Sequence, residues 1–336
     1  MIGRFVVVFC AVLLLAGCDS LAYYRQAIGG HFGVMQAARP LDDWLADPAT
    51  PETLRGRLVL AGRIREFASR ELALPENGSY RSYAELKRPY VVWNVFAAPR
   101  FSVKARKECF PFTGCVSYRG FFSEEEARRH AEALRIQGFD VHVGGVPAYS
   151  TLGWFDDPLL STFIRYPDAQ LARLVFHELA HQVAYAPSDT SFNESFAATV
   201  EQEGVRRWLR AEGRMDELEA FLAAQARRRD FARRVKETRA KLAEIYASDL
   251  PPAEMAHAKA AVYETLREAY PKVVPAEANN AFLLSVSLYT EHVPAFERLL
   301  RESASLPEFY AQVRELARNG GLKRLKPPGP AAARTP

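Results

Sequence analysis

One segment constrains this chain more than any other: Phe176-His177-Glu178-Leu179-Ala180-His181-Gln182. On a helix, His177 and His181 are i and i+4 neighbours, so both imidazoles leave the same face. Two neutral imidazoles at that spacing can bind one Zn²⁺, and Glu178 lies one position round, beside the metal. A carboxylate in that place can take a proton from a water molecule that the metal activates. The segment therefore predicts a helix that carries two metal ligands and a general base.

The flanking sequence supports a helix here and offers a third ligand. Tyr166-Pro167-Asp168 indicates a helix start, and apolar residues then recur with helical spacing from Leu171 to Val183, so we expect the motif to lie mid-helix. Glu194 follows His181 by thirteen positions. The loop between them is long enough to turn a second helix back on the first. The predicted site is one zinc ion per chain, bound by both histidines and Glu194.

Less specific interpretations of the same residues remain open. The two histidines could be solvated helix residues. Ser191-x-x-Glu194 also matches a capping box, in which the glutamate only satisfies a backbone N–H at a helix start. A cap does not explain the histidines upstream, so the ligand role is favoured. Glu201 lies two turns beyond Glu194 on the same face, where it could hydrogen-bond a ligand histidine or merely pair with an arginine.

These motifs resemble those of known metallopeptidases. The segment Asn193-Glu194-x-Phe196-Ala197-x-x-x-Glu201 is similar to the N-E-x-F-A-like segment that supplies the third zinc ligand in gluzincins, a likeness that places Asn193 beside the ligands as a supporting residue. Cys18, the Cys109/Cys115 pair, Ala148–Phe155 and His177–Glu201 together resemble the bacterial lipoprotein aminopeptidases, over most of residues 18 to 320. Two departures stand out: the gap from the second histidine to the glutamate is shorter than in the larger gluzincin aminopeptidases, and there is no G-x-M-E-N segment. Aminopeptidase specificity is therefore implied by the family alone.

The first 18 residues indicate an export signal. Arg4 precedes an apolar run, Phe5 to Leu15, that is too short to span a bilayer of about 30 Å. Leu15-Ala16-Gly17-Cys18 resembles a bacterial lipobox, in which Cys18 is lipidated and becomes the mature N-terminus; the alternative is an ordinary cleaved signal with an incidental cysteine. Asp19 resembles an inner-membrane retention signal. We expect a protein of the bacterial cell envelope, anchored in the membrane through Cys18 and facing the periplasm.

The remaining cysteines agree with export. Apart from Cys10 in the signal and Cys18, the chain has Cys109 and Cys115. In an oxidising compartment an even remainder predicts one disulfide, here closing a short loop. A metal site is the alternative, which neither C-x-x-C spacing nor a nearby histidine supports.

Patterning along the chain predicts an α+β fold that is predominantly helical. At 49% hydrophobic the chain can bury a sizeable core, and its mild net charge of +4, without a zinc finger or a basic tract with interleaved aromatics, indicates no nucleic-acid partner. A strand–strand–helix–strand pattern at 89–166 suits the small mixed sheet that packs on the active-site helix in zincins, although it could be a separate accessory domain. The expected elements of this block are strands at 90–96, 115–121 and 138–143 and a helix from Ser123 to about Gln137. The expected regions are helices at 19–88, a zincin-like core at 89–211, helices at 212–326 and a disordered tail at 327–336.

Two further groups of residues are candidates for substrate contacts. Within Ala148–Phe155, the residues Tyr149, Ser150, Thr151, Leu152 and Gly153 are hypothesised to form an edge strand that pairs with an extended peptide; an ordinary core strand is the alternative. Zinc peptidases also need a donor to the tetrahedral oxyanion. The candidates are Tyr149, Tyr185, Tyr263 and Tyr289, each of which could equally serve in packing.

The sequence thus predicts a zinc-dependent peptidase, with an aminopeptidase favoured. Glu178 is expected to act as general base and acid on a peptide substrate. The alternatives are an endopeptidase, a non-catalytic envelope lipoprotein with a structural zinc site, and a binding protein for cell-wall or secretion machinery.

Overall fold

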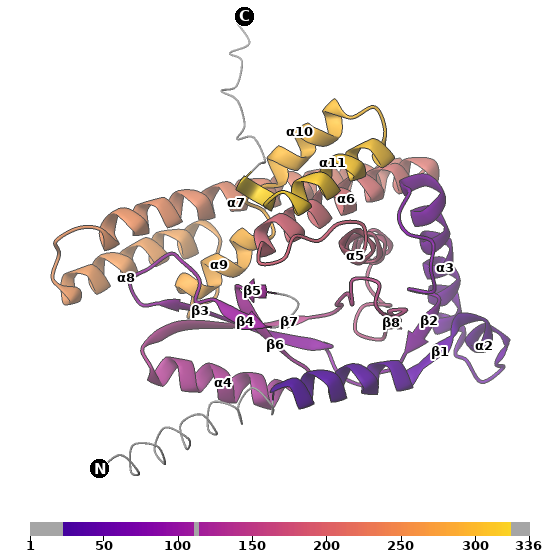
Figure 1. Cartoon of the computed structure of the whole chain (residues 1–336), viewed down its shortest axis with the longest axis horizontal. Coiled ribbons are helices and arrows are strands. Elements are labelled where there is room, and N and C mark those ends of the chain that lie inside the picture. The colour runs from indigo at the N-terminus through magenta and orange to yellow at the C-terminus, as the bar shows by residue number, and fades with distance from the viewer. Residues whose placement is uncertain (1–22, 111–113, 324–336) are drawn as a thin grey trace, which may run out of the picture.

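The computed structural model describes residues 23–110 and 114–323 (Figure 1). The export signal, Cys18, Asp19 and the tail at 327–336 therefore lie outside the described residues. Helical backbone covers residues 23–37. The further helices are α2 (Leu41–Ala46), α3 (Glu52–Leu72), α4 (Glu124–Ile136), α5 (Asp168–His181), α6 (Thr190–Ala211), α7 (Met215–Tyr246), α8 (Pro252–Ala269), α9 (Asn280–Leu288), α10 (Val293–Glu302) and α11 (Leu306–Arg318), followed by a 3₁₀ turn at Gly321–Lys323. The strands are β1 (Ala38–Pro40), β2 (Ser82–Ala84), β3 (Val92–Pro99), β4 (Glu108–Phe110), β5 (Gly114–Val116), β6 (Tyr118–Phe121), β7 (Phe139–Val146) and β8 (Leu159–Leu160).

The largest sheet is antiparallel, in the order β6-β3-β7. Alternate residues of β3 point to opposite faces of it. One face is apolar, with Trp93 and Val95 packed on Ala131 and Leu134 of α4. Toward the end of β3 the other face, at Phe96, packs on α9. The sheet therefore lies between α4 and α9, and Val92 of β3 and Val146 of β7 also join the buried core that contains α5.

A mixed sheet, β1-β2-β8, is closer to α5. Strands β1 and β2 are antiparallel, whereas β2 and β8 are parallel. Tyr83 of β2 and Leu159 of β8 belong to the same buried core as Leu171 and Val175 of α5. The expected α+β fold, mostly helical with a small mixed sheet, is thus correct. The mixed sheet is however not built from the strands predicted at 90–96, 115–121 and 138–143, and its strands β1 and β2 lie in the region 19–88 that was expected to be helical.

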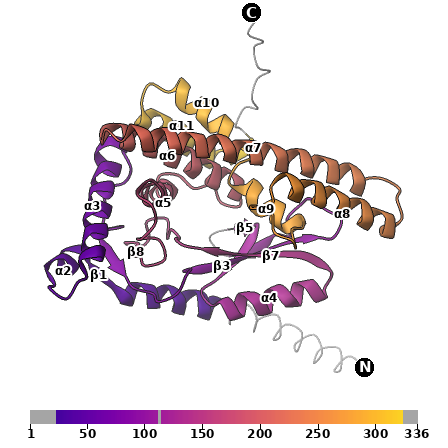
Figure 2. The ribbon, with the colours of Figure 1, turned by 180° about the vertical axis from the view of Figure 1, so that it is seen from behind.

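Helices α3, α5 and α6 form the centre of the main core. Figures 1 and 2 show α5 nearly end-on, beside α3 and beneath α6. Gly204 of α6 allows the closest approach, since a Cβ there would lie 2.6 Å from the ring of Phe176 and 2.8 Å from Leu72 of α3. The packing of α6 on α5 therefore fixes the relative position of the two helices that carry the predicted ligands.

Most predicted elements are present near their expected limits. The strands at 90–96 and 138–143 correspond to β3 and β7, and Ser123 caps α4 by accepting a hydrogen bond from the backbone N–H of Glu126. The expected strand at 115–121 is instead two short strands, β5 and β6, in different sheets. Helices α6 and α7 are separated at Gly213, whose φ is 68°, while Gly204 lies within a continuous α6.

Within the described ranges, every helix is too short or too polar to cross a lipid bilayer.

Candidate metal centre

Helix α5 presents the motif at its carboxyl end. Asp168 in its first turn accepts hydrogen bonds from Arg57 at 2.5 Å and from Arg214 at 2.9 Å, and a negative charge there also suits the helix dipole. The helix ends at His181, so the motif occupies the last turns of α5. The sequence had predicted that the motif lies in the middle of the helix.

Helix α6 begins at Thr190 and is capped by Asp189, whose side chain accepts from the backbone N–H of Phe192 at 3.1 Å. The capping-box interpretation of Glu194 is therefore wrong, and its carboxylate is available for other contacts. Asn193 holds the loop before the helix: its Oδ1 accepts from the N–H of Ala186 at 2.7 Å and its Nδ2 donates to the Ala186 carbonyl at 3.0 Å. Its support of the ligands runs through this loop rather than through a hydrogen bond to a ligand side chain.

The three predicted ligands converge. Nε2 of His177 lies 3.2 Å from Nε2 of His181 and 3.3 Å from Oε2 of Glu194, and His181 Nε2 lies 3.8 Å from the same oxygen. Ligands at about 2.0–2.1 Å from a tetrahedral zinc are roughly 3.3 Å apart. All three side chains are buried, and within the described residues they are the one group of three that could hold a metal ion. Their spacing therefore fits such an ion.

The donor chemistry also fits a cation. Burial opposes a charged His177, but hydrogen bonds with Glu194 and Glu201 raise its pKa to about 10. Burial lowers the pKa of His181 to about 4. Burial also disfavours a charged Glu194, yet its hydrogen bond with His177 keeps the pKa of Glu194 below the ordinary value. The neighbouring carboxylates thus attract positive charge to this point, and a divalent cation that displaces the proton from His177 would supply it to all three side chains at once.

Glu178 lies beside these ligands in the wall of a cleft. Its side chain is buried, and burial raises its pKa to about 7. A carboxylate with a pKa near 7 can both accept and release a proton at neutral pH. The geometry therefore places a competent acid–base group next to the metal ligands.

The Glu201 carboxylate accepts hydrogen bonds from two side chains, those of His177 and Arg173. Nδ1 of His177 donates to its Oε2 at 2.9 Å, and Nη1 of Arg173 donates to its two oxygens at 3.0 and 3.1 Å. The two sequence interpretations, support of a ligand histidine and pairing with an arginine, are thus both correct. This contact fixes the imidazole so that Nε2, and not Nδ1, faces the other ligands.

The cleft has a volume of about 1290 Å³ and is lined by three of the four tyrosines proposed from sequence, Tyr149, Tyr185 and Tyr289. The Tyr289 ring centroid is 6.4 Å from that of His177, whereas the hydroxyl of Tyr149 lies 2.8 Å from Nδ1 of His31. Tyr263 does not line the cleft. It lies in a separate buried cluster, where its hydroxyl donates to Oδ1 of Asn280, 2.9 Å away.

Sequence analysis missed Tyr118 of β6, which also lines the cleft. Burial and the nearby charge of Glu194 raise the pKa of Tyr118. Only the tertiary fold brings this strand residue to the metal ligands, so no local pattern could have indicated it.

The predicted edge strand from Tyr149 to Gly153 is wrong. Leu152 and Gly153 have φ values of 58° and 82°, which are incompatible with a strand, and Trp154 N–H closes a turn on the Thr151 carbonyl. The N–H of Thr151 donates to Oδ2 of the buried Asp157 at 2.9 Å and so is not free to pair with a peptide. The segment still forms part of the cleft wall, including Ser150.

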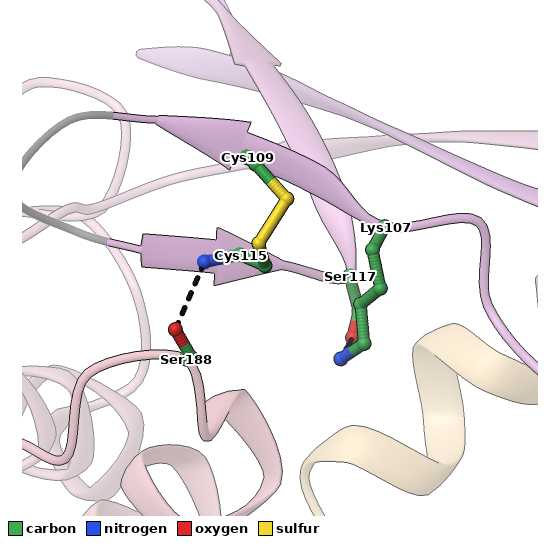
Figure 3. Close-up of a disulfide and its surroundings, with 5 residues drawn as sticks. All are labelled: Lys107, Cys109, Cys115, Ser117 and Ser188. Carbon is green, nitrogen blue, oxygen red and sulfur yellow. Dashed lines mark hydrogen bonds between the residues drawn. A yellow bond between two sulfur atoms is a disulfide. The ribbon is translucent and has the colours of Figure 1, made fainter.

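The predicted disulfide between Cys109 and Cys115 is present and joins β4 to β5 (Figure 3). The N–H of Cys115 donates to Oγ of Ser188 at 3.0 Å, in the loop between α5 and α6. Phe110 and Val116 of the same hairpin line the cleft. The disulfide therefore shapes a cleft wall that contacts the loop between the two ligand-bearing helices.

Comparison with known proteins places the chain in a family. A family model described as "Putative aminopeptidase" matches residues 22–326. The chain belongs to this family. No curated protein and no solved structure matches the chain. The family description indicates peptidase activity, in agreement with the ligand geometry.

Proposed function

We propose that this protein is a zinc-dependent peptidase that removes amino-terminal residues from peptides. The observation that carries the proposal is the convergence of His177, His181 and Glu194 beside Glu178 in the wall of a large cleft. The family description supports action at an amino terminus.

Zinc is the metal that this donor set favours. Two imidazole nitrogens and one carboxylate oxygen are the ligands of many catalytic zinc sites, and three protein ligands leave a coordination position open. A purely oxygen set would have favoured magnesium or calcium instead. When bound, zinc activates water and polarises the scissile carbonyl.

The residues of the chain perform the other steps. Glu178 takes the proton of the attacking water and passes it to the leaving amine. Glu201 keeps His177 in the tautomer that leaves Nε2 free for the ion. Tyr289, Tyr185 and Tyr118 line the cleft, and their hydroxyls have no hydrogen-bond partner among the described residues. They are therefore the candidates for donating a hydrogen bond to the oxyanion.

An endopeptidase is the second candidate. The cleft, at about 1290 Å³, is larger than the roughly 300–1,000 Å³ of small-molecule sites, so it has room for several residues of an extended peptide.

Hydrolysis of a peptide with a free amino terminus, compared with its N-acetylated form, tests both parts of the proposal. We expect the full chain loaded with zinc to cleave the free form faster, and Glu178→Gln to lower kcat by about a thousandfold while zinc content is unchanged. Equal rates for both peptides would favour the endopeptidase. A Glu178→Gln protein as active as the wild type would overturn the mechanism.

We also propose that Cys18 anchors the protein to the bacterial envelope on the periplasmic side, because the sequence around it resembles a lipobox. Cys18→Ala should move the protein from the membrane to the soluble fraction after cell lysis. A variant that stays with the membrane would contradict the anchor.

A further inference from the structure

One face of α7 lines the cleft and is rich in hydrogen-bond donors. Its lining residues recur every three or four positions, as one face of a helix requires. They are Gln225, Arg228, Arg229, Ala232, Arg233, Lys236 and Arg239. In both views α7 runs along the outside of α6, with its far half beside α8.

Several arginines of this wall already have partners. Arg229 pairs with Glu297 at 2.6 Å, and Arg239 pairs with Glu291 at 3.3 Å. Arg233, which also lines the cleft, pairs with Asp230 and Glu237. These acidic groups are therefore not available to neutralise other cations.

Arg228 and Lys236 differ from their neighbours. Among the described residues, neither has an ion pair or a hydrogen-bond acceptor for its side chain. Unlike Arg227, which is not part of the cleft, both line it. The wall thus presents unpaired positive charge where a substrate would lie.

Gln225 supplies a second, independent observation. Its side chain lines the cleft and is only 5% exposed, yet its Nε2 is buried without a hydrogen-bond partner among the described residues. Nε of Arg239 is likewise buried without a hydrogen-bond partner among the described residues. A buried N–H group without an acceptor is destabilising, so such groups in a cleft wall indicate that a ligand supplies the acceptor. On this face of α7, both of these unpartnered atoms are donors.

This donor face lies next to the metal ligands. Arg228 lines the same cleft as His177 and the ion pair of Arg173 with Glu201. Glu201 in turn accepts the hydrogen bond from His177. An acceptor bound at Arg228 would therefore lie in the same cleft as a peptide bond held at the metal centre.

We propose that Arg228 and Gln225 form a subsite for a carboxylate, so that the preferred substrates are short or acidic peptides that carry a carboxylate near the scissile bond. The proposal rests on the proposed peptidase function. The planar guanidinium of an arginine matches a carboxylate with two parallel hydrogen bonds, and the amide of Gln225 adds a neutral donor. Lys236 contributes further positive charge along the wall.

Matched peptides test the subsite in two arms. One arm compares a tripeptide with a free terminal carboxylate against its amide, and the other compares glutamate with glutamine as the second residue of an amidated peptide. We expect the wild-type chain to prefer at least one carboxylate form by roughly tenfold or more in KM. The arm that shows the preference identifies whether the terminal or the side-chain carboxylate is recognised.

Variants of α7 test whether Arg228 causes the preference for the carboxylate form. Arg228→Ala should abolish it, Arg228→Lys should restore part of it, and the matched control Arg227→Ala should keep it. High salt should weaken the preference, since Arg228 is accessible to solvent. Circular dichroism of each variant checks that it folds, and alanine is a good helix former at this position.

Binding separates this subsite from the peptidase proposal. Affinity for the same peptides, labelled with a fluorophore, is measured by anisotropy on the full chain, with no need for cleavage. A carboxylate preference that depends on Arg228, without any hydrolysis, would support the subsite and refute the peptidase. Cleavage with equal KM for the carboxylate and amide forms in both arms, unchanged in Arg228→Ala, would refute the subsite and leave the peptidase standing.

Discussion

Substitution of Gly204 tests how strictly the packing of α6 on α5 holds the metal ligands in place. A Cβ at this position would lie 2.6 Å from Cδ2 of Phe176 and 2.8 Å from Cδ1 of Leu72. Phe176 directly precedes His177, and Gly204 lies on the helix that carries Glu194 and Glu201. Alanine should therefore push the two ligand-bearing helices apart.

The magnitude follows from two opposing effects. Alanine in place of glycine within a helix stabilises by about 1 kcal/mol. Overpacking against a buried ring costs about 1–3 kcal/mol, because an aromatic ring cannot turn aside as the end of a leucine can. We expect a net loss of about 1 kcal/mol in the free energy of unfolding. A shift of a few tenths of an ångström between the helices should also weaken zinc binding.

Urea denaturation and zinc titration against a competing chelator measure the two effects. The matched control is Gly62→Ala in α3, where a Cβ would meet no atom within 4 Å, so only the gain of about 1 kcal/mol should remain. If Gly204→Ala were as stable as Gly62→Ala and bound zinc as tightly as the wild type, the contact between α5 and α6 would not position the ligands.

Two further predictions concern single carboxylates. Burial raises the pKa of Asp157 from 3.8 to about 6. Between these pH values the folded chain keeps a proton on Asp157 that the unfolded chain loses. The free energy of unfolding should therefore fall by up to about 3 kcal/mol as pH rises from about 4 to beyond 6. Asp157→Asn should therefore raise Tm at pH 7 but not at pH 4, and an equal change at both pH values would contradict this cause. Glu201→Gln should lower zinc affinity about 10- to 100-fold, because its contact orients His177. Arg173→Gln leaves the contact between Glu201 and His177 in place, so it should lower zinc affinity less than Glu201→Gln does. A larger loss of affinity in Arg173→Gln would show that the arginine and not the carboxylate positions His177.

Much of the centre could be predicted from sequence because its signals are local or periodic. Two histidines one turn apart share a helix face, and Glu201 shares a face with Glu194, so their common site follows from helical geometry alone. The strand β3, the cap at Ser123 and the disulfide likewise depend on short-range patterns.

The wrong predictions arose where distant residues decide the structure. The segment at Thr151 has the composition of a strand, but the N–H of Thr151 donates to the buried Asp157, and Leu152 adopts a left-handed conformation. Helix α7 has an alternating charge pattern typical of a solvated surface. Only the tertiary fold turns the face with Arg228 toward the cleft.

Zinc titration of the purified chain tests the central claim most directly. The account predicts one zinc ion per wild-type chain, bound tightly, and a large loss of affinity in both His177→Ala and Glu194→Gln, since each removes or weakens one of three ligands. A wild-type chain that binds no zinc, or a Glu194→Gln variant that binds it as tightly as the wild type, would contradict a centre built from two histidines and this glutamate.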